Sequence, residues 1–281
     1  MSDQRQQTPF RWESGIAWKN KTRIVIRGYD VNALTGNLDF GQMLFLVLRG
    51  ELPTPEQGAI TNALMVNLAE HAMSPSSATV RFATSGGAEL NAAVAAGISA
   101  IGRLHGTSDR PAELYLSVER RAAEEGLSLE ETAAKVVREM REVRERMPGF
   151  HHAQHIRDPR TERLFSLADK LGITGTYMTI ARAMEDATED VFGRRVWING
   201  PGAMGAVGLD AGYQPRELKA MFIVARSLSL AAHSIEESTT QKGWRASDNA
   251  DMVQPLSLQM QGPDYYDGPD DRQLPDGWNQ R

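Results

Sequence analysis

Cysteine is absent from this 281-residue chain, and several chemistries are excluded with it. Without a thiol the chain has no disulfide framework, no cysteine-ligated zinc, no iron–sulfur cluster and no cysteine nucleophile. Glycine-rich phosphate loops are also missing, because no Gly-x-Gly-x-x-Gly follows a strand pattern and no Walker-type loop occurs. We therefore expect neither a dinucleotide-binding fold nor a P-loop nucleotide site.

Excess positive charge and long apolar runs are lacking too. The chain carries 31 Lys and Arg against 36 Asp and Glu, for a formal net charge of −5, which argues against nucleic acid as a partner. No uninterrupted apolar run reaches the roughly 18 residues of a membrane span, and residues 1–8 lack the apolar core of a secretory signal. We expect a soluble, cytoplasmic protein without a membrane partner.

Helical periodicity dominates the remaining pattern. Strand-like alternation occurs once, at residues 22–27, whereas apolar residues elsewhere recur every three or four positions. Capping and proline signals predict helix starts at Thr54-Pro55, at Ser128 with Glu131, at Asp158-Pro159 and at Pro215. The sequence therefore predicts a mostly α-helical fold with little sheet.

Two helices carry more specific expectations. An Ala- and Gly-rich helix is predicted over residues 89–104, buried and central because small residues let neighbouring helices approach closely. The helix that starts at Pro215 is expected to bury one apolar face, formed by Leu218, Met221, Phe222, Ala225 and Leu228.

The six histidines are the first candidates for chemistry: His71, His105, His151, His152, His155 and His233. The spacing of His152 and His155 suits two metal ligands on one helix face. However, this segment follows a Pro-Gly break, and no nearby carboxylate cluster completes a site, so no metal site is predicted. For His233, inside an Ala-rich run, a structural role is favoured.

Three separated stretches carry residues in a recognisable order: residues 71–81, residues 92–106 and residues 148–160. They hold a His before a Ser/Thr-rich segment, an Ala-rich helix that leads to His-Gly, and a Pro-Gly-aromatic-x-His loop before Asp-Pro-Arg. Together they resemble the citrate synthase superfamily. The Trp-Arg and Tyr-Asp-Gly sequences near the end are more similar to its citryl-CoA lyase branch.

This resemblance implies an all-α, citrate synthase-like fold with two domains. Residues 1–105 and 204–281 would form the large helical domain, and residues 106–203 the smaller inserted one. The active site is expected in the cleft between them, where closure would expel water. The resemblance also implies a homodimer, in which Arg245 would reach into the neighbouring subunit.

Two catalytic histidines are implied by the resemblance. His105 would donate a hydrogen bond to the thioester oxygen, where negative charge develops in the enolate. His152 would exchange a proton with the oxygen on the oxaloacetate side, for which the titration range of imidazole is suited.

The implied substrate is a coenzyme A thioester with several carboxylates, and no tightly bound cofactor is expected. Guanidinium groups bind carboxylates in a bidentate fork. The resemblance assigns this role to Arg160, Arg226 and Arg245, with His71 as a further polar contact. His151 and Asp210 are additional candidates for the site.

Three departures from the family pattern stand out. Pro201 occupies the position of the family's catalytic Asp, and proline cannot transfer a proton at the acetyl carbon. Asp210 is the nearest substitute, although it is better suited to a helix cap. His151 stands where the family usually has Gly, whose backbone freedom it lacks, and residues 106–109 are less glycine-rich than the family's run near coenzyme A.

The favoured function is cleavage of a citryl-CoA-type thioester to acetyl-CoA and oxaloacetate. Three alternatives remain open: a citrate or 2-methylcitrate synthase-like condensing enzyme, a thioesterase-like enzyme, and a non-catalytic binder of coenzyme A or a tricarboxylate.

Overall fold

A computed structural model describes residues 13–152 and 155–244. Three short strands, β1 (Ala17–Lys19), β2 (Ile24–Ile26) and β3 (Tyr29–Asp30), form one antiparallel sheet in the order β1-β2-β3. The helices in these ranges are α1 (Val31–Leu34), α2 (Phe40–Arg49), α3 (Pro55–Ala69), α4 (Pro75–Ser85), α5 (Leu90–Ser99), α6 (Asp109–Glu125), α7 (Leu129–Glu142), α8 (Pro159–Lys170), α9 (Thr176–Phe192), α10 (Gly200–Asp210) and α11 (Pro215–Thr240). The predicted all-α class is confirmed.

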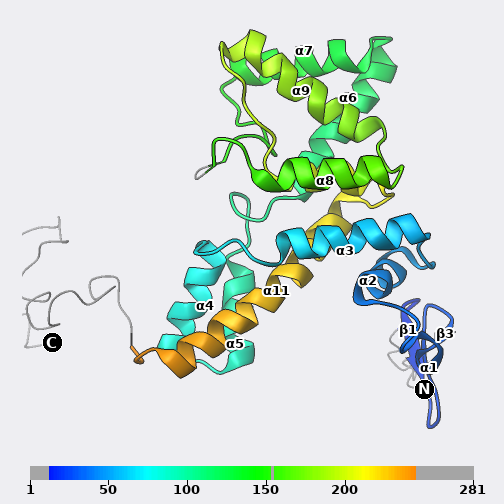
Figure 1. Ribbon diagram of the computed structural model, residues 1–281, viewed down its shortest axis with the longest axis vertical. Coiled ribbons are helices and arrows are strands. Elements are labelled where there is room, and N and C mark those ends of the chain that lie inside the picture. The colour runs from blue at the N-terminus through cyan, green and yellow to red at the C-terminus, as the bar shows by residue number, and fades with distance from the viewer. Residues whose placement is uncertain (1–12, 153–154, 245–281) are drawn as a thin grey trace, which may run out of the picture.

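The helices form an upper and a lower group, and helices α3 and α11 connect the two (Figure 1). Helices α6, α7 and α9 pack on one another above α8, whereas α4 and α5 pack on α11 below. Helix α10 contacts α6, α8 and α9, and α3 contacts both α8 and α11. Most buried apolar side chains belong to a single core that runs through α3 and α6–α11.

The four predicted helix starts are confirmed, and three of them show the expected capping contacts. The side chains of Thr54 and Ser128 each accept the backbone N–H three residues on, and the Glu or Gln there bonds back to the cap. Asp158 accepts the backbone N–H of Arg160. Each such cap satisfies amide groups that an uncapped helix end leaves unpaired.

The expectation of a central, buried helix over residues 89–104 is wrong. Helix α5 ends at Ser99, and of its residues only Ala93 and Gly97 are buried. A Cβ at Gly97 would lie 3.0 Å from the Ser76 carbonyl oxygen, so the small residues allow close packing on α4 along one face alone. Likewise Leu228, expected on the buried face of α11, is 70% exposed.

Helix α11 is the only helix of the described part that is long and apolar enough to cross a membrane by length and composition. It packs along α3, α4 and α5, and it buries the charged side chains of Arg226 and Glu237. Arg81 on α4 neutralises Glu237 across this contact, at 2.8 Å. These features identify α11 as a core helix of the fold.

A close backbone contact holds α10 against the loop that leads to His151. A Cβ at Gly202 would lie 2.1 Å from the carbonyl oxygen of Gly149, and Gly149 itself has a φ of +85°. The backbone N–H of Asn199 donates to the same carbonyl, at 2.9 Å. This contact fixes where the histidine loop begins relative to α10.

We predict that Gly202→Ala destabilises the fold, because its methyl group would overlap the Gly149 carbonyl. The expected loss in the free energy of unfolding is about 1–3 kcal/mol, as for other overpacked sites, measured by urea denaturation. Gly102→Ala is the control, since a Cβ there meets nothing within 4 Å. Equal stability of the two variants would contradict this account of the loop.

Candidate functional site

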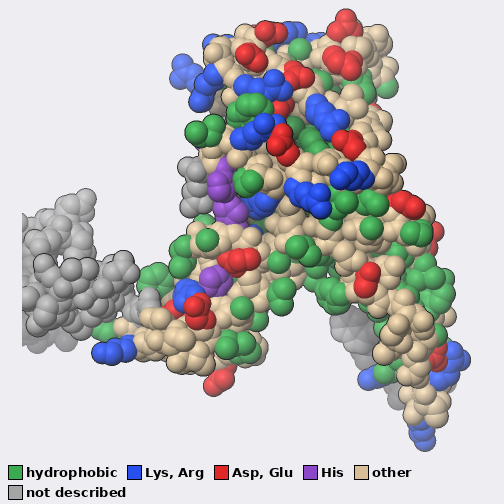
Figure 2. Space-filling model, in the orientation of Figure 1, with side chains coloured by type: hydrophobic (Ala, Val, Ile, Leu, Met, Phe, Trp, Pro, Cys, Tyr) green, Lys and Arg blue, Asp and Glu red, His purple; other side chains and the backbone are tan. Residues whose placement is uncertain are grey.

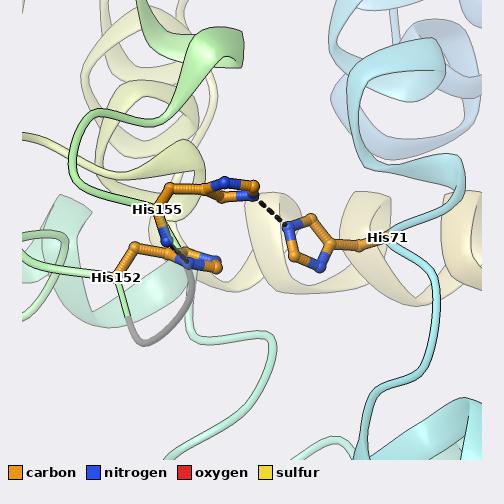
Figure 3. Close-up of side chains that lie close together, drawn as sticks. All are labelled: His71, His152 and His155. Carbon is orange, nitrogen blue, oxygen red and sulfur yellow. Dashed lines mark hydrogen bonds between the residues drawn. The ribbon is translucent and has the colours of Figure 1, made fainter.

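Three segments far apart in the sequence bring histidines together. His71 follows the end of α3, His105 lies in the loop between α5 and α6, and His152 and His155 lie between α7 and α8. Figure 2 shows histidine side chains gathered where the upper helices meet the lower group. In Figure 3 the rings of His152 and His155 face His71 across the gap between two loops.

The rings of His71, His152 and His155 are in mutual contact. Their centroids lie 5.1 Å apart for His71 and His152, 5.4 Å for His71 and His155, and 4.5 Å for His152 and His155. His155 Nε2 and His71 Nε2 are 3.3 Å apart, and the backbone N–H of His155 donates to His152 Nδ1 at 3.2 Å. The sequence pattern missed this grouping because the third imidazole comes from a remote segment.

His105 is held by a buried serine. Its Nε2 lies 2.8 Å from the hydroxyl of Ser76, which is fully buried in the first turn of α4. Burial, followed by repulsion from Arg226, Lys219 and His71, lowers the pKa of His105 to about 4. The imidazole is therefore neutral at pH 7. If Ser76 donates to Nε2, then Nδ1 carries the proton and is the atom left to donate.

His71 and His152 are also kept neutral. Burial lowers the pKa of His71, and the positive charges of Arg160 and Arg226 lower it further. Burial likewise lowers the pKa of His152, against the opposing attraction of the Asp158 carboxylate. A positive charge on His71 would lower the pKa of both His105 and His152, the two predicted catalytic groups.

Arg226 provides a buried positive charge beside these imidazoles. Its side chain lies on α11, only 2% exposed, and its Nε donates to the Leu68 carbonyl oxygen at 3.1 Å. The guanidinium stacks on the Phe222 ring at 5.1 Å. Burial lowers the pKa of Arg226, partly offset by the charge of Glu70. A buried cation of this kind favours an anionic ligand.

Arg160 is fixed by a buried carboxylate. Its Nε and Nη2 donate to the two oxygens of Asp158, at 2.9 and 2.6 Å, and Asp158 also accepts the N–H of Gly200 at 2.8 Å. Burial alone would raise the pKa of Asp158, but the hydrogen bonds from Arg160 lower it to about 2. The ion pair thus joins the start of α8 to the start of α10.

His151, which stands where the family usually has Gly, adopts a backbone conformation that is typical of glycine. Its φ is +62°, in the left-handed region that favours glycine. Two backbone hydrogen bonds of His151 hold it there: its N–H donates to the Trp197 carbonyl, and its own carbonyl accepts from Asn199 Nδ2. The side chain borders a cavity of about 300 Å³ that Arg195 and Trp197 also line.

Pro201 and Asp210 lie at opposite ends of α10. Pro201 is in the first turn, and Asp210 is the last residue of this 11-residue helix, about 13 Å further along the axis. The Asp210 carboxylate accepts the N–H groups of Gly175, Tyr177 and Met178. It therefore caps α9, and the structure does not bring it to the histidines as a substitute for the missing Asp.

The remaining candidates have other surroundings. Arg245 lies outside the described residues. Arg81 and His233 bond to each other, at 3.0 Å from Nε to Nδ1, and both pair with acidic side chains of the lower helices. His233 therefore has the structural role that the sequence favours. Ser76 and Asp158, by contrast, contact predicted site residues but were not assigned a role from the sequence.

The comparisons with known proteins agree with this geometry. The family model described as citrate synthase, C-terminal domain, matches residues 55–247. The structure of citryl-CoA lyase from Hydrogenobacter thermophilus matches with a TM-score of 0.80 and 31% identity, over 94% of this chain and 97% of that one.

Two more distant matches extend the comparison. The ternary complex of citrate synthase from Thermoplasma acidophilum with carboxymethyl coenzyme A and oxaloacetate has a TM-score of 0.63 and 21% identity, over 86% of this chain and 60% of that one. This likeness shows the fold alone. "Putative citrate synthase 2" of Mycobacterium tuberculosis is 28% identical over 232 residues, which are 80% of this chain and 56% of the relative. The chain thus spans little more than half the length of the curated relatives it matches.

We predict that the His105 imidazole stays neutral down to a pH of about 4, where its lowered pKa lies. In the urea-unfolded chain its pKa returns to about 6.5. The unfolded chain then binds a proton first, so this residue's contribution to stability is complete above pH 6.5 and is lost as the pH falls toward 4.

Imidazole NMR titration of folded and unfolded protein, with His105→Gln to assign the signal, measures both values. A folded pKa at or above 6.5 would contradict the burial and charge environment described for His105.

Proposed function

The chain belongs to the citrate synthase family, and we propose that it cleaves a citryl-CoA-type thioester to acetyl-CoA and oxaloacetate. The observations that carry the proposal are the contact of His152 with His71, at 5.1 Å between ring centroids, and the seating of a neutral His105 on Ser76, with Arg160 and Arg226 close enough to lower the pKa of His71. The likeness to citryl-CoA lyase, at 31% identity over nearly the whole of both chains, supports cleavage as the favoured reaction.

Cleavage begins at the tertiary hydroxyl of the substrate. His152, whose lowered pKa leaves it unprotonated at pH 7, takes the hydroxyl proton as general base. The bond between the carbinol carbon and the methylene next to the thioester then breaks. Its electron pair passes to the thioester side as an enolate, and the hydroxyl becomes the keto group of oxaloacetate.

The enolate oxygen is stabilised by His105. A neutral imidazole is suited to this role because it donates a hydrogen bond without delivering a full proton. Ser76, at 2.8 Å from Nε2, acts as a positioning residue that directs the other ring nitrogen toward the substrate. Since the donor is half-buried, its hydrogen bond is stronger than the same contact in water.

The carboxylates of the substrate are bound by the arginines. Arg226 contributes a buried charge beside His71 and His105. The Asp158 ion pair uses two donors of Arg160 out of the five that a guanidinium offers, which leaves donors for a ligand. Arg245 is proposed as a further contact from the neighbouring subunit. The homodimer and the division into domains 1–105 with 204–281 and 106–203 stay predictions.

In the register that the resemblance gives, Pro201 replaces an Asp that would speed proton transfer at the acetyl carbon in both directions. Cleavage ends when the enolate carbon takes a proton, and water can supply it. Condensation runs over the same path in reverse, so the loss of this group slows both directions by the same factor, and the preference for cleavage rests on the likeness to citryl-CoA lyase. The chain thus keeps groups for the carbon–carbon bond but lacks a carboxylate at Pro201 for the carbon–hydrogen step.

Pro201 favours a second candidate. Hydrolysis of the thioester needs no proton transfer at carbon, so a thioesterase-like reaction would use the same acyl-CoA site without the missing Asp. Release of citrate and free coenzyme A, instead of oxaloacetate and acetyl-CoA, identifies this alternative.

We predict that purified protein releases oxaloacetate from citryl-CoA, followed through malate dehydrogenase and NADH. His152→Ala should lower kcat by about 10²–10⁴-fold, the usual value of a positioned acid–base group. His155→Ala is the control and should keep most of the activity, since His155 takes no part in the mechanism. Equal losses in the two variants, or coenzyme A binding with no turnover of citryl-CoA, would contradict the proposal.

We predict that Pro201→Asp accelerates exchange of the acetyl-CoA methyl protons with solvent deuterium, by up to about 10²–10⁴-fold. An acidic residue in the first turn of α10 is compatible with the helix dipole, so the variant is expected to fold. Pro201→Asn, which has the same shape without a carboxylate, is the control. If Asp exchanges protons no faster than Asn, position 201 does not face the methyl carbon.

A further inference from the structure

The imidazoles of His71, His152 and His155 present ligand atoms to a common point. One ring nitrogen from each side chain lies within 4.8 Å of those of the other two. The rings come from two loops that face each other, and none of the three side chains is fully exposed or fully buried (Figure 3). Imidazole nitrogen is a ligand that Zn²⁺, Ni²⁺ and Cu²⁺ share.

One of these separations already matches a zinc site. Zinc–nitrogen bonds of about 2.0–2.1 Å place the ligand nitrogens of a tetrahedral ion about 3.3–3.4 Å apart. The Nε2 atoms of His71 and His155 are 3.3 Å apart. The group's ligand atoms lie within 4.8 Å of one another, so the nitrogen of the third imidazole needs to move by at most about 1.5 Å to reach that spacing. His152 lies on a loop, and a rotation of its ring provides such a shift.

The surrounding charges permit a cation. Arg160 lowers the pKa of His71, and the Asp158 carboxylate pairs with this guanidinium at two points. The charge of Arg226 is opposed by that of Glu70. Arg195, which lines the same cavity as His152 and His155, pairs with Glu185. These ion pairs offset part of the positive charge that a divalent ion would meet.

We propose that His71, His152 and His155 bind one Zn²⁺-type transition-metal ion, and that the bound ion switches the enzyme off. Three imidazoles would occupy three tetrahedral positions, with water or a carboxylate in the fourth. The ion takes the lone pair of His152 that the proposed reaction needs for the substrate hydroxyl. The inhibitory part therefore rests on the proposed function, whereas the binding site does not.

The binding test is calorimetric titration of the metal-free full chain with Zn²⁺. Since the chain has no cysteine, thiolates do not compete for the ion. We expect one ion per chain. His155→Gln keeps a polar side chain but removes a ligand, and should weaken binding by more than the roughly 10–100-fold that an outer-shell change costs. His71→Gln should do the same, and His233→Gln, a histidine outside the cluster, should bind as wild type does.

Co²⁺ adds a readout that does not depend on activity, because tetrahedral coordination gives it an intense visible spectrum that His155→Gln should lose. In the citryl-CoA assay, Zn²⁺ should inhibit the wild-type protein at the concentrations that fill the site, and His155→Gln should resist it. Wild-type protein without a bound ion, or binding that is unchanged in His155→Gln and His71→Gln, overturns the site. If Zn²⁺ fills the site and the turnover of citryl-CoA does not change, the proposed inhibition is wrong. If the metal-free protein does not turn over citryl-CoA, the proposed function is wrong, but the metal site is not affected.

Discussion

Burial of imidazoles beside fixed positive charge is the constraint on which the chemistry of this protein depends. Burial and the charges of Arg160 and Arg226 lower the pKa of His71, and burial with Arg226 and Lys219 lowers that of His105. The scaffold holds these charges in place: Arg226 is bonded to the end of α3 through Leu68, and Arg160 pairs with Asp158, which caps α8 and also accepts the N–H of Gly200 at the start of α10. The same groups that would bind a substrate's carboxylates therefore keep the imidazoles neutral, and a neutral imidazole is what both proposed catalytic roles require.

Local features of this fold could be predicted from the sequence, and long-range ones could not. The caps at Thr54, Ser128 and Asp158 act within three residues, so their signals are complete in the sequence. The exposure of α5 could not be predicted because small residues show that a helix can pack closely, not on how many sides. The pairing of Ser76 with His105 joins residues 29 positions apart, and the motif resemblance brought both segments to the site without stating that contact. His155 illustrates the opposite case: its spacing from His152 was visible, but its contact with His71 depends on the fold.

The family resemblance places Pro201 where a catalytic Asp is expected, and this register carries the proposed change in chemistry. His105 and His152 are the groups proposed to act on the carbon–carbon bond, and Asp210, the nearest acidic candidate, caps α9. Without a carboxylate at position 201, proton transfer at carbon would be left to water, which slows cleavage and condensation by the same factor. Position 201 would therefore limit the rate of proton transfer at carbon, and a metal ion bound to the histidine cluster would block proton transfer by His152.

The most direct measurement of the central claim is a crystal structure of the protein with oxaloacetate and carboxymethyl coenzyme A. The account predicts that His152 contacts the keto oxygen of oxaloacetate, that His105 contacts the carboxymethyl group, and that Arg226 binds a carboxylate of oxaloacetate in the same site. Ligands bound away from these side chains, or His105 and His152 facing different molecules that do not meet, would contradict it.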